Sequence, residues 1–319
     1  MFGALDSLPS VPLAPYPTPV EELSGLHAAL GGPRLLVKRD DAIAFGGGGN
    51  KVRKLRLVAA DALRHGADTL ITCGGVQSNH ARATAATAAK LGLRCVLIAN
   101  GSKPERPTAN ALLARLFGAD VRYVATRADR GPAMDAAAAE LRRAGRVPYV
   151  IPLGASTPLG ACAFVQAIAE LVQQIAPPDV IVHATSSGGT QAGIVAGCTL
   201  AGLPTRVVGI SADEPSAAMQ QDIRGILIGL GPLLGLPPER FANAAIEVDD
   251  RFVGGGYGIP TPESQEALEL AARSDGVILD PTYTSKAMAA LIAAIRGREW
   301  PDRETVLFWH TGGQIGLFA

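Results

Sequence analysis

A lysine that follows four consecutive glycines is the feature of this sequence that most directly suggests chemistry. The stretch FGGGGNKVRKL spans residues 45–55, and Lys51 stands where helical spacing of apolar residues begins. Each glycine costs roughly 0.5–1 kcal/mol relative to alanine, so four in succession indicate that something approaches this backbone closely. We expect the helix dipole and neighbouring cations to lower the pKa of the lysine amine, which would make it a nucleophile or imine-forming group. The alternative is a solvated lysine in a flexible loop.

Only cations occupy the first turns of this predicted helix, which should begin at or near Asn50. Arg53, Lys54 and Arg56 accompany Lys51, although the helix macrodipole favours acidic side chains at this end. A bound anion would resolve the conflict. The segment therefore predicts an anionic ligand close to Lys51.

Two further stretches read as strand, turn and helix, and either could bind a ligand. In TLITCGGVQSNHARATAATAAKLG, Ser78 or Asn79 caps the helix, and polar caps at the ends of parallel strands are where open α/β sheets bind ligands. Equally, Ser78 could be a cap only, and His80 an ordinary hydrogen-bonded residue of the first turn. In HATSSGGTQAGIVAG, the backbone N–H groups of residues 186–190 form a phosphate cradle, although the pattern is neither a Walker loop nor G-x-G-x-x-G.

Three hydroxyl side chains complete the candidates. Tyr257 stands in GGGYGIP, Tyr283 in DPTYTSKAM, and Thr311 directly after the apolar run TVLFWH. Tyrosines in such loops can transfer protons or bind substrate, although most simply pack their rings, and Thr311 could equally stand in a plain turn.

The elements that would position these residues alternate between short apolar runs and alanine-rich helical runs. Runs that are apolar throughout are typical of parallel strands covered by helices on both faces, so the sequence predicts the α/β class. Residues 9–19 read as an extended arm, and residues 225–238 and 254–262 as long loops. The expected strands cover residues 69–73, 94–99, 121–125, 148–152, 179–185, 205–211 and 305–310.

Composition excludes several classes of function. The 319 residues carry 29 basic and 29 acidic side chains, without a basic block, which argues against nucleic acid or a membrane surface as partner. Four cysteines without a C-x-x-C pair predict reduced, buried thiols and no metal site. With neither a signal peptide nor an apolar run of about 18 residues, the expected location is the cytoplasm.

Taken in order, GGNKVRKL, GGVQSNHARATA, SSGGTQAG, DPTYTSKAM and HTGG resemble the D-cysteine desulfhydrase and 1-aminocyclopropane-1-carboxylate (ACC) deaminase family. This is a branch of the pyridoxal-phosphate (PLP) enzymes with the tryptophan-synthase-β type of fold, fold type II. The resemblance implies two open, twisted, mostly parallel sheets flanked by helices. Residues 1–51 and 159–319 would form a larger PLP-binding domain, residues 52–158 a smaller inserted α/β domain, and the protein a homodimer.

The resemblance also implies roles for individual residues. Lys51 would bind PLP covalently and take the α-proton of the substrate, Asn79 would hydrogen-bond the ring hydroxyl, and Thr311 would lie near the pyridine nitrogen. The residues implied to bind the cofactor are Lys51, Asn50, Lys54, Asn79, Ser187, Gly188, Gly189, Thr190 and Thr311. Those implied to be catalytic are Lys51, Ser78, Tyr257 and Tyr283, and those implied to contact substrate are Ser78, Asn79, His80, Tyr257 and Tyr283.

Two positions favour the desulfhydrase side of the resemblance. Proteins similar to ACC deaminase tend to carry Gln where this chain has His80 and Glu where it has Thr284. The expected reaction is α,β-elimination on a small amino acid, first of all D-cysteine to pyruvate, sulfide and ammonia. L-cysteate sulfo-lyase or ACC deaminase activity is the alternative, and a non-catalytic ligand-binding protein is the rival from another class. AFGGGGNK and TSK depart from the more usual GLAFGGNK and TGK.

Overall fold

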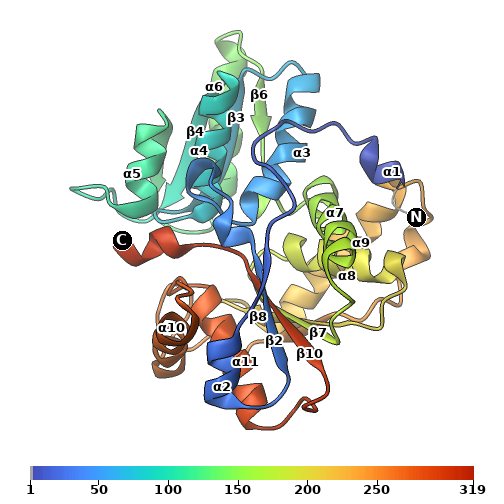
Figure 1. Ribbon diagram of the computed structural model, residues 1–319. Coiled ribbons are helices and arrows are strands. Elements are labelled where there is room, and N and C mark those ends of the chain that lie inside the picture. Colours follow the sequence, from blue (N-terminus) through green and yellow to red (C-terminus); the bar gives the residue numbers. More distant parts are fainter. Residues whose placement is uncertain (1–2) are drawn as a thin grey trace.

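Two open β-sheets with helices on both faces make up the structure, a computed structural model that describes residues 3–319 (Figure 1). The six-stranded sheet has the order β1 (Val20–Glu22), β2 (Arg34–Arg39), β10 (Thr305–His310), β7 (Val180–Thr185), β8 (Arg206–Ser211) and β9 (Glu247–Asp249). The four-stranded sheet has the order β5 (Asp120–Val124), β4 (Arg94–Asn100), β3 (Thr69–Gly75) and β6 (Pro148–Val150). Every pairing is parallel except that of β1 with β2, so the predicted fold class is confirmed.

The helices enclose both sheets. They are α1 (Gly3–Asp6), α2 (Ser24–Leu30), α3 (Lys51–Arg64), α4 (Asn79–Leu91), α5 (Ala109–Leu116), α6 (Arg130–Arg143), α7 (Pro158–Gln174), α8 (Gly189–Ala201), α9 (Ser216–Leu233), α10 (Pro262–Asp275) and α11 (Thr284–Arg296). Short 3-10 turns are η1 (Asp40–Ala42), η2 (Phe45–Gly47), η3 (Leu153–Ala155), η4 (Pro238–Phe241) and η5 (Gln314–Phe318).

Alternating side chains of the strands divide the core into layers. In β7, Ile181 packs against α7, α8 and α9, whereas Val180 and Val182 pack against α2, α10 and α11 on the opposite face. In the small sheet, Leu70 faces α3 and α4, and Ile71 faces α6. Strands buried on both faces explain why these runs are apolar throughout.

Some elements differ from the sequence-based expectation. Residues 225–238 were expected to be a loop, but α9 continues to Leu233 because Leu227 and Leu230 are fully buried against the core, which outweighs the low helix propensity of the glycines around them. The strands β1, β2 and β9 were not predicted. Residues 9–19 contain no helix or strand, as expected for an arm, and the loop expected at 254–262 is irregular up to the start of α10.

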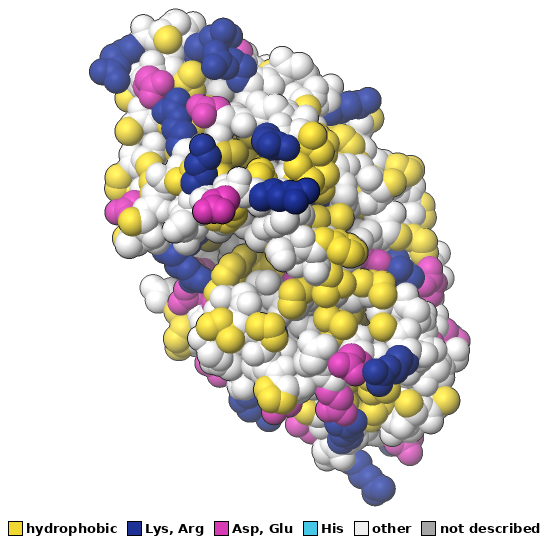
Figure 2. Space-filling view, turned by 90° about the vertical axis from the view of Figure 1, so that its left-hand side faces the viewer, with side chains coloured by type: hydrophobic (Ala, Val, Ile, Leu, Met, Phe, Trp, Pro, Cys, Tyr) yellow, Lys and Arg dark blue, Asp and Glu magenta, His cyan; other side chains and the backbone are white. Residues whose placement is uncertain are grey.

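The small sheet and α3 to α6 fall within residues 52–158 apart from Lys51 itself, but the division of the chain into two domains stays a prediction. All four cysteines are free and buried. Over residues 3–319, no helix has both the length and the apolar character needed to cross a membrane. Basic and acidic side chains are interspersed on the face in Figure 2, which also shows the molecule narrowing between its upper and lower halves.

Candidate active site

A cavity of about 910 Å³ lies at the carboxyl ends of the parallel strands. Residues that follow strands of the four-stranded and of the six-stranded sheet line it. Lys51 lies at the first residue of α3, and the loops after β3, β7 and β10 supply the other walls. The predicted site residues that line the cavity are Asn50, Lys51, Ser78, Asn79, His80, Ser187, Gly188, Thr190, Tyr257, Tyr283 and Thr311. The two others, Lys54 and Gly189, lie beside Ser156, which also lines it.

The four glycines before Lys51 allow their backbone to lie close to neighbouring parts of the chain. All of residues 46–49 have positive φ, between 57° and 93°, where side chains with a Cβ are strained. A Cβ at Gly48 would lie 2.5 Å from the Ile43 carbonyl oxygen, and one at Gly46 would lie 2.6 Å from the Ala86 Cβ. The close approach expected from the sequence is therefore made at least in part by the protein's own backbone and by α4.

Enclosure by the cavity walls lowers the pKa of the Lys51 amine to about 8, because the charged form loses water there. The sequence-based reasoning expected a lowered pKa but attributed it to the helix dipole and neighbouring cations. At neutral pH a useful fraction of this amine is therefore unprotonated.

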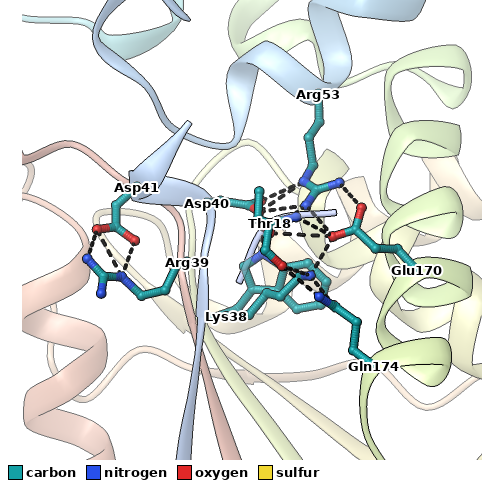
Figure 3. A network of polar contacts seen from close by, with 9 residues as sticks. Thr18, Lys38, Arg39, Asp40, Asp41, Arg53, Glu170 and Gln174 are labelled. Carbon is teal, nitrogen blue, oxygen red and sulfur yellow. Dashed lines mark hydrogen bonds and ion pairs between the residues drawn. The ribbon is translucent and has the colours of Figure 1, made fainter. Parts of the chain in front are cut away.

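The Arg53 guanidinium makes all its hydrogen bonds to other side chains of the protein (Figure 3). Its guanidinium donates to both carboxylate oxygens of Asp40 at 2.8–3.0 Å, to Glu170 at 2.9 and 3.0 Å, and to the Thr18 hydroxyl. Arg56 donates to the Gln166 side chain. These two side chains thus have partners within the protein and do not need a bound anion. Lys51 and Lys54 remain.

Lys54 is a buried cation without a carboxylate contact in the described part of the chain. Its Nζ donates to the Gly154 carbonyl and to the Ser156 hydroxyl, each at 3.2 Å, and burial holds its pKa well below the ordinary value. The Gly189 N–H at the start of α8 also donates to Ser156, and the Ser156 and Ser187 hydroxyls are 2.8 Å apart. A cation, hydroxyls and a helix N-terminus thus converge on one corner of the cavity.

Glycine keeps this corner open. A Cβ at Gly189 would lie 2.7 Å from the Ser156 hydroxyl and 2.8 Å from the Lys54 Nζ. Such a donor set fits a phosphate dianion. The dianion would also provide the negative counter-charge that the Lys54 ammonium group does not have within the protein. No local motif marks Ser156, because the turn before α7 brings it to the corner.

Asn50, Ser78 and His80 each make a hydrogen bond inside the cavity wall. The Asn50 amide donates to the Thr190 hydroxyl at 3.1 Å. Ser78 caps α4 by accepting from the Ala81 N–H, so its capping role is real and it also faces the cavity. His80 is buried, with its Nε2 2.8 Å from the Thr72 hydroxyl; burial, together with the nearby lysine cations, holds its pKa well below the usual range, so it is neutral.

Tyr257 and Tyr283 form a hydrogen-bonded pair through their hydroxyls, with ring centroids 5.6 Å apart. Burial raises the pKa of both phenols, so both are protonated at neutral pH. The Arg127 guanidinium lies 5.0 Å from the centre of the Tyr257 ring and forms an ion pair with Asp213, which also lines the cavity. Sequence reasoning missed Arg127, whose partner is 86 residues away.

Residues 11–312 match the family described as pyridoxal-phosphate dependent enzymes. The chain belongs to this family. Its cofactor is pyridoxal 5'-phosphate, and the corner around Lys54 and Ser156 fits the phosphate of that cofactor.

Solved structures of this family are similar to the chain over nearly its whole length. A structure described as an ACC deaminase homologue is 36% identical, with a TM-score of 0.92, covering 99% of this chain and 95% of the other. Threonine deaminase isoform 2 from Solanum lycopersicum is 15% identical, with a TM-score of 0.73, covering 98% and 83%. A PLP-dependent aspartate racemase is 16% identical, with a TM-score of 0.69, covering 93% and 90%. The last two likenesses concern the fold alone.

If Lys51 is the residue that binds PLP covalently, as the sequence predicts, its lowered pKa determines how uptake of PLP by the apoenzyme depends on pH. Only the unprotonated amine can attack the aldehyde of the cofactor, so the rate should rise about tenfold per pH unit below the midpoint and level off above it. We expect the midpoint at about pH 8. Stopped-flow absorbance at fixed PLP concentration measures this rate, and a rate still rising at pH 9.5 would contradict the assignment.

Proposed function

We propose that this PLP-dependent enzyme catalyses α,β-elimination on a small amino acid, with D-cysteine as the preferred substrate. The observation that carries the proposal is the Lys51 amine, with a pKa of about 8, in the same cavity as Ser78 and the Tyr257–Tyr283 pair. An amine that is partly neutral at physiological pH can bind an aldehyde and accept a proton.

Each cofactor group has a proposed partner. Lys51 holds PLP covalently, Lys54 and Ser156 with residues 187–190 hold the phosphate, and Asn79 donates to the ring hydroxyl oxygen. When bound, PLP supplies the electron sink for the substrate's α-carbon. Thr311, which lines the cavity, would lie at the pyridine nitrogen; a hydroxyl cannot protonate that nitrogen as a carboxylic acid can, which favours elimination over racemisation.

Lys51 takes the proton from the substrate's α-carbon, and the Cβ–S bond then breaks with the electron pair leaving on sulfur. One hydroxyl of the protonated tyrosine pair donates to the other, so the pair supplies one free hydroxyl donor on the cavity wall for the departing thiolate. Water replaces the amino nitrogen of the three-carbon product. In sum, cysteine and water give pyruvate, hydrogen sulfide and ammonia.

Deamination of ACC is the second candidate, favoured by the 36% identical structure described as an ACC deaminase homologue. Of the two positions that argue against it, only His80 lines the cavity. Thr284 is fully buried, and its hydroxyl donates to Asp280 and accepts from the Asp280 N–H. L-cysteate elimination also stays open.

A substrate panel tests the proposal. Keto-acid release by the PLP-saturated protein should be at least about tenfold higher in kcat/KM for D-cysteine than for L-cysteine, L-cysteate, D-serine or ACC. Sulfide should appear in equal amount to pyruvate. Preferential formation of 2-oxobutyrate from ACC would overturn the assignment in favour of the second candidate.

If every substrate fails while PLP stays bound, the rival of a non-catalytic binding protein gains support. The homodimer and the cytoplasmic location stay predictions.

A further inference from the structure

Arg82, on α4, is a cation in an unusual place. Arg82 is only 1% exposed. Among the described residues, its guanidinium contacts carbonyl and amide oxygens and no carboxylate. Burial lowers its pKa to about 10, so it stays charged at neutral pH. Burying an unpaired charge is costly, and the residue therefore needs strong polar partners.

Its partners lie behind the cavity wall, on the glycine loop before Lys51 and on α5. The guanidinium donates to the carbonyl oxygens of Gly46 and Gly48, at 3.0 Å for the second, in the loop that leads to Lys51. Through Nε it also donates to the Asn110 Oδ1 at 3.0 Å. A single side chain thus joins the loop of the lysine to the region of Asn79.

Asn110 connects Arg82 to Asn79, a residue of the cavity wall. Its Nδ2 donates to the Asn79 Oδ1 and to the Gln77 carbonyl, each at 2.9 Å. Asn79 in turn lines the cavity.

The orientation of both amides follows from the chemistry of arginine. A guanidinium has donors and no acceptor, so Asn110 must turn its oxygen to Arg82 and its NH₂ group to Asn79. Asn79 must then meet that NH₂ group with its own oxygen. The Asn79 NH₂ group is left to face the cavity as a donor.

We propose that Arg82 is a positioning residue that, through Asn110, fixes the Asn79 amide with its donor towards the cofactor's ring oxygen, while it holds the glycine loop before Lys51. The inference rests on the proposed contact of Asn79 with the ring hydroxyl. It assigns no contact between Arg82 and the cofactor or the substrate.

The isosteric substitution Asn110→Asp tests the relay. Aspartate still accepts from Arg82, now as an ion pair, but it cannot donate to Asn79, whose amide should flip and turn its oxygen to the cavity. Loss of the donor makes the ring oxygen more basic, so the pH midpoint of the absorption change of bound PLP should rise by about one to two units. Asn79→Ala should give a similar rise.

Two further variants complete the experiment. Arg82→Lys keeps the charge but loses the fork of donors, and we expect the dissociation constant of PLP to rise roughly 2- to 12-fold. Thr87→Val, on the same helix and equally buried, removes only a bond to the Ala83 carbonyl and should leave midpoint and affinity unchanged.

The proposal is overturned if Asn110→Asp keeps the wild-type midpoint while Asn79→Ala raises it. It is equally overturned if neither variant changes the midpoint. Keto-acid release is scored separately on the wild-type holoenzyme, so failure of the relay is distinguishable from failure of the proposed elimination.

Discussion

Replacement of Lys51 by alanine should abolish turnover and leave PLP without a covalent bond to the protein. Removal of a general base alone costs about 10²–10⁴-fold in rate, and this residue is also the proposed attachment point of the cofactor. Treatment with borohydride should fix PLP to the peptide that contains Lys51 in the wild type, which mass spectrometry detects. In Lys51→Ala no PLP should remain attached.

Lys51→Arg is the matched variant. It keeps a cation at the N-terminus of α3 but lacks an amine that can bind PLP covalently. It should bind PLP reversibly, through the corner around Lys54 and Ser156, and should be as inactive as the alanine variant. Turnover in Lys51→Ala above one hundredth of the wild-type rate would show that another group performs these steps.

Much of the fold could be predicted because the central strands are buried on both faces. β3, β4, β7, β8 and β10 are apolar almost throughout, and each is bounded by residues that form turns. β1 and β9, three residues each, lie at the edges of the sheet, where little apolar sequence is needed. The loop predicted at 225–238 was wrong for residues 225–233, where tertiary packing stabilises a helix despite its glycines, whereas residues 234–237 are irregular as predicted.

Prediction of the site depended on short contiguous motifs, which place Lys51, Ser78, Ser187 and Tyr283 in one cavity. The contacts that orient these residues join distant parts of the chain and have no local pattern. Arg82 reaches Asn110 over 28 residues, and Lys54 reaches Ser156 over 102. The lowered pKa of Lys51 was expected from its sequence neighbours, yet its cause is burial, which only the folded chain reveals.

The second large effect concerns the stability of the helix that begins with Lys51. Asp40 is fully buried, and it accepts from Arg53, from the Thr18 hydroxyl and from the Trp309 indole at 3.0 Å. Lys38 lies in the same network, where it donates to Glu170 and Gln174 (Figure 3). The N-terminal arm, the end of β2 with η1, α7 and β10 are thus joined to α3 by one network.

Asp40→Ala should destabilise the protein by about 3–5 kcal/mol, because the buried Arg53 cation keeps only Glu170 as a counter-charge. At roughly 2–4 °C per kcal/mol, the thermal midpoint of the holoenzyme should fall by about 6–20 °C. Differential scanning calorimetry at saturating PLP measures the change. Asp40→Asn keeps the size and one acceptor, so its loss should be smaller.

A surface pair provides the control for Asp40→Ala. Arg34 and Glu22 are both more than half exposed, and solvent screens their ion pair at 3.2 Å, so the pair should contribute little to stability. Glu22→Ala should therefore leave the thermal midpoint nearly unchanged. Equal shifts for Asp40→Ala and Glu22→Ala would mean that burial of the Asp40–Arg53 pair does not determine its contribution, and that α3 is held mainly by its apolar face.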